Sequence, residues 1–191
     1  MPRNLLIIYG HPVRDAFSEN LLSQYCHGAE TAGASIRQLK IRELDFELNL
    51  KGGYRHDQDL EPDLQKAQEH ILWAEHIVFI FPNWWATFPA LFKGFIDRTF
   101  SYLKPDYLTH SIPSRLQGGK KLVFIQTQAL PDETQFADVF PRYEYFFKWY
   151  GFDDIRSVRA CGVTEPGEVR ERKDAMDLAA ETARNLMEGG A

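Results

Sequence analysis

The sequence predicts an α/β protein built on a doubly wound, five-stranded parallel sheet with helices on both of its faces. Three apolar runs, at residues 5–9, 77–81 and 122–125, have the length of strands and show no alternation of polar and apolar residues. Continuous hydrophobicity is typical of parallel strands that helices cover on both sides. Helical patterns separate these runs, and such an alternation of strand and helix predicts a parallel sheet.

The remaining elements complete this alternation in chain order. Two weaker strands are expected at 35–40 and 154–161. Five helices are expected at 16–32, 64–74, 88–102, 136–150 and 169–187. The connections are short except at 41–60 and 104–119, and loops that long in a compact domain usually have a function.

Composition and charge limit the class of protein. The 191 residues fit a single domain over 1–191, and 44% hydrophobic with 26% charged residues is typical of a soluble globular protein. No apolar run approaches the ~20 residues needed to cross a bilayer, and the N-terminus has no small-residue signal cleavage site. Cys26 and Cys161 have no paired spacing and no nearby histidine, so we expect two structural thiols in a reducing cytoplasm and no metal site. A net charge of −5 without a basic run argues against a nucleic-acid partner.

Ligands of a doubly wound sheet bind beyond the carboxyl ends of its strands, where the winding reverses. For the expected strand order, this point lies between the first and the third strand. The segments that follow Tyr9, Phe81 and Thr127 therefore form the candidate site.

The segment after the first strand, residues 10–20, is suited to a phosphate. It opens a helix whose first backbone amides are unpaired and carry a partial positive charge. Ser18, Asn20 and His11 can add side-chain donors, although neither a dinucleotide fingerprint nor a P-loop is present. The alternative is that Asp15 or Ser18 merely caps the helix.

The segment after the next strong strand, residues 81–89, is rigid and aromatic. Trp84 and Trp85 stand side by side between Pro82 and Pro89. An isoalloxazine ring needs flat apolar surface for stacking and backbone groups for its polar edge, and this loop can offer both. The alternative is that the indoles belong to the core, which we expect for one of them rather than for both. Residues 126–131, after the fourth strand, carry polar side chains compatible with the edge of a cofactor.

These segments resemble the NAD(P)H:quinone oxidoreductase family, whose fold is flavodoxin-like. The resemblance rests on Gly-His-Pro at 10–12 with Ser18 and Asn20, and above all on residues 82–100. There a Trp-containing loop is followed by P-A-x-x-K-G-x-x-D-R-x-F, directly after the third strand. The order of strands and helices agrees over nearly the whole chain.

The resemblance implies a flavoenzyme that passes two electrons from NAD(P)H to a quinone or related acceptor by a ping-pong mechanism. The flavin can be FMN or FAD, and the lack of a C-terminal extension that could clasp an adenosine favours FMN. The implied flavin contacts are His11, Phe17, Ser18 and Asn20 at the phosphate and ribityl chain, Pro82, Asn83, Trp84, Trp85 and Ala86 beside the ring, and Thr127 and Gln128 in the second ring-binding loop. Lys93, Asp97 and Arg98 are interpreted as structural charges of a helix surface, which pairs such groups at i, i+4.

One departure from the family pattern concerns the turn after the fourth strand. The family has two glycines there, whereas this chain has Ala129 and Leu130, which cannot adopt positive φ cheaply. The edge of the flavin must therefore be held differently, and no catalytic side chain is assigned. Tyr107, in the loop 104–119, is a candidate wall of the acceptor pocket.

The helix at 143–150 carries more aromatic side chains than one buried stripe can use. Phe146, Trp149 and Tyr150 share one face, and Tyr143 and Phe147 share a neighbouring one. One face can pack on the sheet, so we expect the other to form a homodimer interface. Two alternatives to an enzyme remain open: a flavodoxin-type electron carrier, and a redox-sensing regulatory subunit docked peripherally on a membrane transporter.

Overall fold

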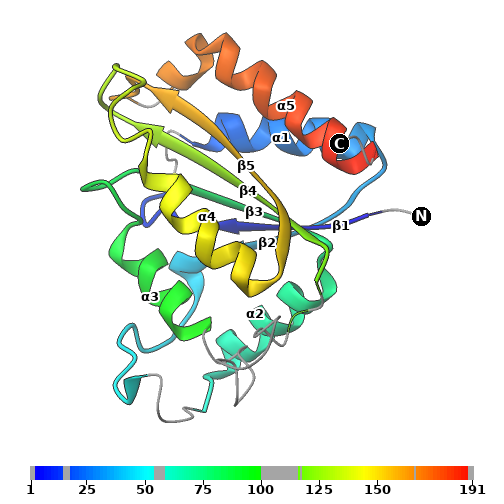
Figure 1. Cartoon of the computed structure of the whole chain (residues 1–191), viewed down its shortest axis with the longest axis vertical. Helices are drawn as coiled ribbons and strands as arrows, with labels where there is room; N and C mark the ends of the chain where they lie inside the picture. The colour runs from blue at the N-terminus through cyan, green and yellow to red at the C-terminus, as the bar shows by residue number, and fades with distance from the viewer. Residues whose placement is uncertain are drawn as a thin grey trace.

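The computed structural model of the chain describes residues 3–14, 18–53, 59–99, 116, 118–165 and 167–188. Five strands form one sheet: β1 (Asn4–Tyr9), β2 (Ser35–Lys40), β3 (His76–Pro82), β4 (Lys120–Gln128) and β5 (Phe152–Cys161). Their order is β2-β1-β3-β4-β5 and every neighbouring pair is parallel. The doubly wound, flavodoxin-like sheet expected from the sequence is confirmed, with the winding reversed between β1 and β3 (Figure 1).

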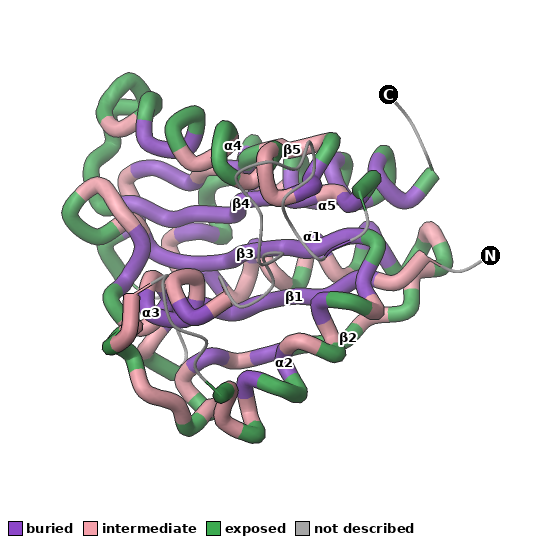
Figure 2. Tube along the Cα trace, turned by 60° about the horizontal axis from the view of Figure 1, so that its bottom comes forward, coloured by how far each residue is buried: buried purple, intermediate pink, exposed green. Residues whose placement is uncertain are grey.

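The strength of each strand pattern follows from the position of the strand in the sheet. The three continuous apolar runs are the central strands β1, β3 and β4, which are buried almost throughout (Figure 2). The two weaker patterns are the edge strands β2 and β5, each of which keeps exposed residues. An edge strand is covered less completely, so its sequence retains polar side chains.

Two layers of helices cover the sheet. Helices α1 (Glu19–Thr31) and α5 (Lys173–Glu188) lie on one face, and α2 (Pro62–Trp73), α3 (Ala90–Arg98) and α4 (Val139–Tyr150) lie on the other (Figure 1). Short 3₁₀ turns occupy Ile41–Glu43 (η1) and Glu168–Glu171 (η5). Helix α4 begins three residues later than expected, after Phe136 in a left-handed conformation with φ 61°. Within the described residues, no helix is long and apolar enough to cross a membrane.

The two faces of the sheet have different cores. Against α1 and α5 the core is largely aliphatic, and α1 approaches α5 so closely that a Cβ on Gly28 would lie 2.5 Å from the Ala180 carbonyl oxygen. Against α2, α3 and α4 the core is rich in phenylalanine, with Phe79 and Phe92 in edge contact at 5.1 Å. This aromatic core lies directly beneath the carboxyl ends of β3 and β4.

The charges of α3 have two different structural roles. Lys93 and Asp97 pair across one turn at 2.6 Å, as expected for a helix surface. Arg98, in contrast, is buried, so it is a structural charge as expected but does not lie on the helix surface. Its guanidinium donates to both carboxylate oxygens of Glu61, at 3.0 and 2.8 Å, and to the backbone oxygen of Glu47 at 2.7 Å. Arg98 thereby fixes the segment before α2 against α3.

Both cysteines are free thiols in this fold. Cys161 is buried at the end of β5 and Cys26 is half-buried on α1. Burial, reinforced by the charge of Glu30, raises the pKa of the Cys26 thiol to about 11. A thiol with such a pKa is almost entirely protonated at neutral pH, so it is a poor nucleophile. Among the described residues, no cluster of three His, Cys, Asp or Glu side chains is placed to hold a metal ion.

Candidate functional site

The carboxyl ends of β1, β3 and β4 bring the three predicted segments together. All strands of the parallel sheet end at the same edge (Figure 1). In the strand register, Tyr9 lies opposite Ile80, and Pro82 lies opposite Thr127. The segments that follow these residues are therefore neighbours in space, at the point where the winding reverses.

Gly10 lets the first segment lie tightly on the sheet. Its backbone N–H donates to the Ile80 oxygen at 2.8 Å, which ties the segment to β3. A Cβ at this position would lie 2.4 Å from the ring of Phe92, so any side chain would displace the aromatic core. Position 10 therefore requires glycine, because no side chain fits between its backbone and the ring of Phe92.

His11 is a buried, neutral imidazole. Its Nδ1 accepts a hydrogen bond from the Val13 N–H at 3.1 Å, so the neutral ring carries its proton on Nε2. Desolvation by burial, together with the positive charge of Arg42, lowers the pKa of His11 to about 4. The ring also meets Trp84 edge-on, with centroids 5.9 Å apart. His11 can therefore offer one N–H donor without adding a charge.

Ser18 stands immediately before α1, but it does not cap the helix with its side chain. Its hydroxyl instead donates to the Tyr9 hydroxyl at 3.3 Å, fully buried. The alternative in which Ser18 is merely a capping residue is therefore wrong. Asn20, in the first turn, accepts a hydrogen bond from Arg170 at 2.9 Å through its side-chain oxygen, which orients its amide. Phe17 and Asp15 lie outside the described residues.

The aromatic segment after β3 forms a tight two-residue turn. Trp84 and Thr87 exchange two backbone hydrogen bonds at 3.1 and 3.0 Å. Trp85 and Ala86 between them both have positive φ, 53° and 56°. These features define a type I′ turn, which normally carries Asn or Gly at its centre. A residue other than glycine is strained there by about 1–2 kcal/mol.

Neither tryptophan of this turn belongs to the core. Trp84 is 44% exposed and Trp85 is 98% exposed, so the expectation that one indole would be buried is wrong. The reason lies beneath the turn, where Phe81 and Phe88 already fill the available space with their centroids 4.6 Å apart. The chain thus holds two large aromatic surfaces at the edge of the sheet, at a cost in backbone strain.

Tyr143 anchors the base of the aromatic turn. Its hydroxyl lies 2.7 Å from Thr87 Oγ1, and its ring packs on Phe88 with centroids 4.5 Å apart. The sequence placed Tyr143 only on a helix face. Its spacing of three residues after Phe140 and four before Phe147 is the signal that puts it on the core-facing stripe of α4.

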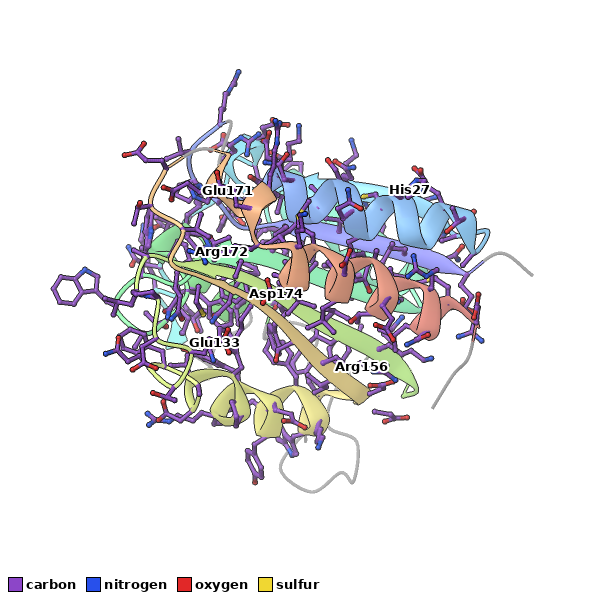
Figure 3. The ribbon with its side chains drawn as sticks, turned by 90° about the horizontal axis from the view of Figure 1, so that it is seen from above. His27, Glu133, Arg156, Glu171, Arg172 and Asp174 are labelled. Atoms are coloured by element: carbon purple, nitrogen blue, oxygen red, sulfur yellow. The ribbon has the colours of Figure 1, made fainter. Side chains whose placement is uncertain are left out.

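The turn after β4 is held by side chains where the family pattern has glycines. Gln128 donates to the Leu130 oxygen at 3.0 Å and accepts from Arg159 of β5 at 3.0 Å. Arg159 also donates to the backbone oxygens of Glu133 and Gln135, at 2.9 and 2.8 Å. Figure 3 shows Glu133 in this loop, on the α4 side of β5. The side chain of Gln128 is therefore committed to the loop, and Ala129 and Leu130 need no positive φ.

On the other side of β5, Arg172 holds the end of that strand in place, as Arg159 holds the loop after β4. It lies at the start of α5 (Figure 3) and donates to the Gly162 oxygen at 2.8 Å. Gly162 has φ 68°, and a Cβ there would lie 2.6 Å from the Arg172 guanidinium. The carboxyl edge of the sheet is thus kept in place by arginines on both sides of the last strand.

The sequence profile of the family described as having a flavodoxin-like fold matches residues 3–186. The chain belongs to this family.

Curated relatives of this flavodoxin-like chain carry oxidoreductase names. Over 104 residues it is 29% identical to an uncharacterized NAD(P)H oxidoreductase of Haemophilus influenzae, a match that covers 52% of this chain and 51% of that protein. Over 46 residues it is 39% identical to a ribosyldihydronicotinamide dehydrogenase-like protein of Penicillium crustosum, covering 24% of this chain and 17% of that protein. The matched regions thus span about half or less of the length of these two relatives.

Solved structures share the fold over almost the whole chain. An NAD(P)H:quinone oxidoreductase from Methanothermobacter marburgensis superposes with a TM-score of 0.77 at 21% identity, covering 97% of this chain and 98% of that one. An FMN-dependent NADH-azoreductase from Bacillus anthracis, in complex with FMN, gives a TM-score of 0.67 at 21% identity, covering 97% and 99%. The flavodoxin-like fold predicted from the sequence is confirmed, and the names of these relatives agree with the resemblance drawn from its motifs.

The residues at the site fit the flavin that the resemblance implies. Asn83 Oδ1 and both polar atoms of the Gln126 side chain are buried without a hydrogen-bond partner in the described part of the chain. Unpaired buried polar atoms cost about 1–3 kcal/mol each unless water or a ligand satisfies them; Gln126 is fully buried opposite Phe81, so Asn83 Oδ1 is the one of these atoms next to the aromatic turn. The Asn83 N–H donates to the Thr127 oxygen at 2.8 Å, which fixes both residues beside the aromatic turn. A flat ring with alternating donors and acceptors along one edge has the chemistry that such atoms need.

The predicted site residues thus fall into three groups. The structure brings together eight of them at the carboxyl edge of the sheet: His11, Ser18, Pro82, Asn83, Trp84, Trp85, Ala86 and Thr127. Asn20 and Gln128 lie at the same edge with their side-chain oxygens bound to the protein. Phe17 and Tyr107 lie outside the described residues.

Proposed function

We propose that this chain is a flavin-dependent NAD(P)H oxidoreductase that binds FMN at the carboxyl ends of β1, β3 and β4 and reduces a quinone or a related acceptor. The observation that carries this proposal is the pairing of two unlike surfaces at one edge of the sheet. One is the start of α1 with His11 and Ser18, which suits a phosphate. The other is the strained turn that exposes Trp84 and Trp85, which suits a flat ring.

The start of α1 supplies hydrogen-bond donors that belong to no charged side chain. The first amides of a helix have no intrahelical acceptor, and they attract anions. The Nε2–H of His11 adds a neutral donor, because the pKa of about 4 keeps the ring uncharged at neutral pH. Its contribution to binding should therefore be insensitive to pH between 6 and 8.

The aromatic turn supplies the stacking surface and keeps it in one orientation. The Thr87–Tyr143 hydrogen bond and the Phe88 contact fix its base, so the indoles are presented on a rigid support. A pre-organised aromatic surface loses little entropy on binding a planar ligand. Quinones, azo compounds and nitroaromatics all meet the requirement of a flat acceptor.

When bound, the flavin would accept a hydride from NAD(P)H and deliver two electrons to the acceptor, as the relatives' names suggest. The protein's own task is then to orient and to exclude water, since a cofactor carries the difficult chemistry. This agrees with a site in which no side chain is assigned as catalytic. FMN is preferred to FAD in this proposal because an FMN-dependent azoreductase shares the fold over nearly the whole chain.

The proposal extends to assembly, with residues 1–191 as one flavin-binding domain in a cytoplasmic homodimer. On α4, Tyr145 and Phe146 are exposed and touch one another edge-on at 5.5 Å. Tyr150 does not share this exposed face, contrary to expectation. It packs against the core and its hydroxyl donates to the Thr99 oxygen, because it continues the stripe of Tyr143 and Phe147.

Anaerobic mixing with NADPH or NADH, followed by addition of a benzoquinone, tests the proposed reaction. We expect rapid bleaching of the protein-bound FMN absorbance by the nicotinamide and its return on adding the quinone. A protein that binds FMN but is bleached only through a separate reductase would be an electron carrier. A protein that binds FMN, turns over no acceptor and is recovered on a membrane transporter would be the regulatory subunit.

A further inference from the structure

Arg42 is a largely buried cation, and two of its three guanidinium nitrogens lack hydrogen-bond partners in the described part of the chain. It belongs to η1, directly after β2, and its side chain is 10% exposed. Its Nε and Nη1 are buried and have no hydrogen-bond partner in the described part of the chain. Its Nη2 makes a loose ion-pair contact of 3.9 Å with the adjacent Glu43, whose side chain is 53% exposed, and its guanidinium also contacts the Tyr9 hydroxyl.

The chain shows elsewhere how it satisfies a buried structural arginine. The side chain of Arg98 is 2% exposed, against 10% for Arg42, and it makes a bidentate contact with Glu61 in addition to a bond to a backbone oxygen. Among the described residues, Arg42 has no bidentate carboxylate and no backbone oxygen of this kind, and its closest polar neighbour is the Tyr9 hydroxyl. A buried guanidinium without acceptors is costly, and proteins normally pair it. Two of its nitrogens are therefore open to an acceptor from beyond the described residues.

The position of Arg42 indicates the chemistry of the acceptor that its guanidinium would bind. Its guanidinium carbon lies 5.1 Å from the ring centroid of Tyr9, at the carboxyl edge of the sheet. The hydroxyl of the same tyrosine bonds to Ser18, at the start of α1. The side chain of Tyr9 thus contacts both the Arg42 guanidinium and the Ser18 hydroxyl. Ser18 directly precedes α1, so Arg42 lies near the start of that helix. Glu19, in the first turn of α1, is the acidic group nearest to this cluster on that helix.

We propose that Arg42 binds the phosphate group of FMN, as a second, side-chain half of the phosphate site formed by the start of α1. A planar guanidinium donates strong, charge-assisted hydrogen bonds to phosphate oxygens, so a dianionic ligand would supply the acceptor that Arg42 lacks. This inference rests on the proposed function. It adds a residue from beyond β2 that none of the three binding segments contains.

The test compares FMN with riboflavin, which has the same ring but no phosphate. Dissociation constants of both are measured by flavin fluorescence, at one ionic strength, for the wild type, Arg42→Met and Arg42→Lys. Arg37→Met is the matched control, because it removes the same charge from β2, where the exposed Arg37 stacks on Trp73 at 4.0 Å. The unfolding of each ligand-free variant is measured in parallel.

We expect Arg42→Met to reduce the preference for FMN over riboflavin by roughly 10- to 100-fold, the loss typical of a charge-assisted hydrogen bond. Arg42→Lys should retain part of the preference, and Arg37→Met should retain all of it. The ligand-free Arg42→Met protein should be at least as stable as the wild type, since an unpaired buried charge has been removed. A structural arginine would give the opposite result.

Three results would overturn the inference. The preference for FMN stays unchanged in Arg42→Met, both flavins lose affinity equally, or Arg37→Met behaves in the same way as Arg42→Met. These results leave the proposed function standing as long as the wild type binds FMN. Failure of the wild type to bind either flavin would instead contradict the proposed function, and the inference with it.

Discussion

The strained backbone of the aromatic turn leads to a specific prediction about the stability of Trp85 variants. Its φ of 53° lies in the left-handed region, and its side chain is 98% exposed. Replacing Trp85 with Ala removes the indole but keeps a Cβ in the strained conformation. Replacing it with Gly removes the indole and the strain together. The two variants therefore separate the effect of the backbone from that of the side chain.

The expected magnitude follows from two opposing contributions. Relief of the left-handed conformation should add about 1–2 kcal/mol to the free energy of unfolding. The greater freedom of glycine in the unfolded chain should subtract about 0.5–1 kcal/mol. Trp85→Gly should thus be more stable than Trp85→Ala by about 0–1.5 kcal/mol, with a central value of about 0.7 kcal/mol. Because the indole is exposed, neither variant should lose stability through packing.

Urea unfolding of the ligand-free proteins checks this prediction, because a change in midpoint at constant slope measures stability alone. Both variants should bind FMN more weakly by about 1 kcal/mol, roughly fivefold in the dissociation constant, through loss of one stacking surface. A glycine variant less stable than the alanine variant would refute the strained turn. A sharp loss of stability in both variants, with FMN affinity intact, would show that the indole is packed rather than available.

Four further predictions follow from single residues. Gly10→Ala should lower the melting temperature by an amount corresponding to roughly 1–3 kcal/mol, because the new methyl group would overlap the ring of Phe92; an unchanged melting temperature would contradict the close approach. Burial lowers the pKa of His76 to about 3, so between pH 6.5 and 3 the unfolded state takes up a proton that the folded state does not, and the free energy of unfolding falls as the pH drops through this window. A His76→Gln variant should show a flatter pH dependence in parallel urea titrations, and an identical one would exclude this role. Arg159→Met should speed amide hydrogen exchange in the loop 129–135, where it removes three hydrogen bonds, and exchange rates equal to those of the wild type would show that the loop is held by other contacts. Phe146→Glu should convert the proposed homodimer into a monomer in light scattering, and a dimer that persists would place the interface elsewhere.

The fold could be predicted from the sequence because its strongest signals are local. The runs in β1, β3 and β4 are apolar without interruption, and only a strand covered on both faces requires this. The weaker patterns of β2 and β5 were also sufficient, since the alternation with helices left no other place for them. The helix starts were less well predicted. Helix α4 begins only after Phe136, whose positive φ has no signature in the sequence.

The candidate site could be located but not detailed from the sequence. The rule that ligands bind at the carboxyl ends of parallel strands selected three segments that the structure brings together, without any side-chain information. The exposure of both Trp84 and Trp85 depends on Phe88 filling the space below them, which is a tertiary effect. The bond between Gln128 and Arg159 joins residues 31 positions apart and stands in for the glycine turn that this chain lacks. Neither contact has a local pattern that could have indicated it.

The central claim is that the carboxyl edge of this sheet is a flavin site, and equilibrium binding of FMN tests it most directly. Ligand-free protein is titrated with FMN while flavin fluorescence and the melting temperature are followed together. The account predicts saturable quenching with one flavin per chain and a melting temperature that rises with FMN concentration, because a ligand that binds only the folded state stabilises it. No quenching and no rise in melting temperature, with FMN and with FAD alike, would contradict it.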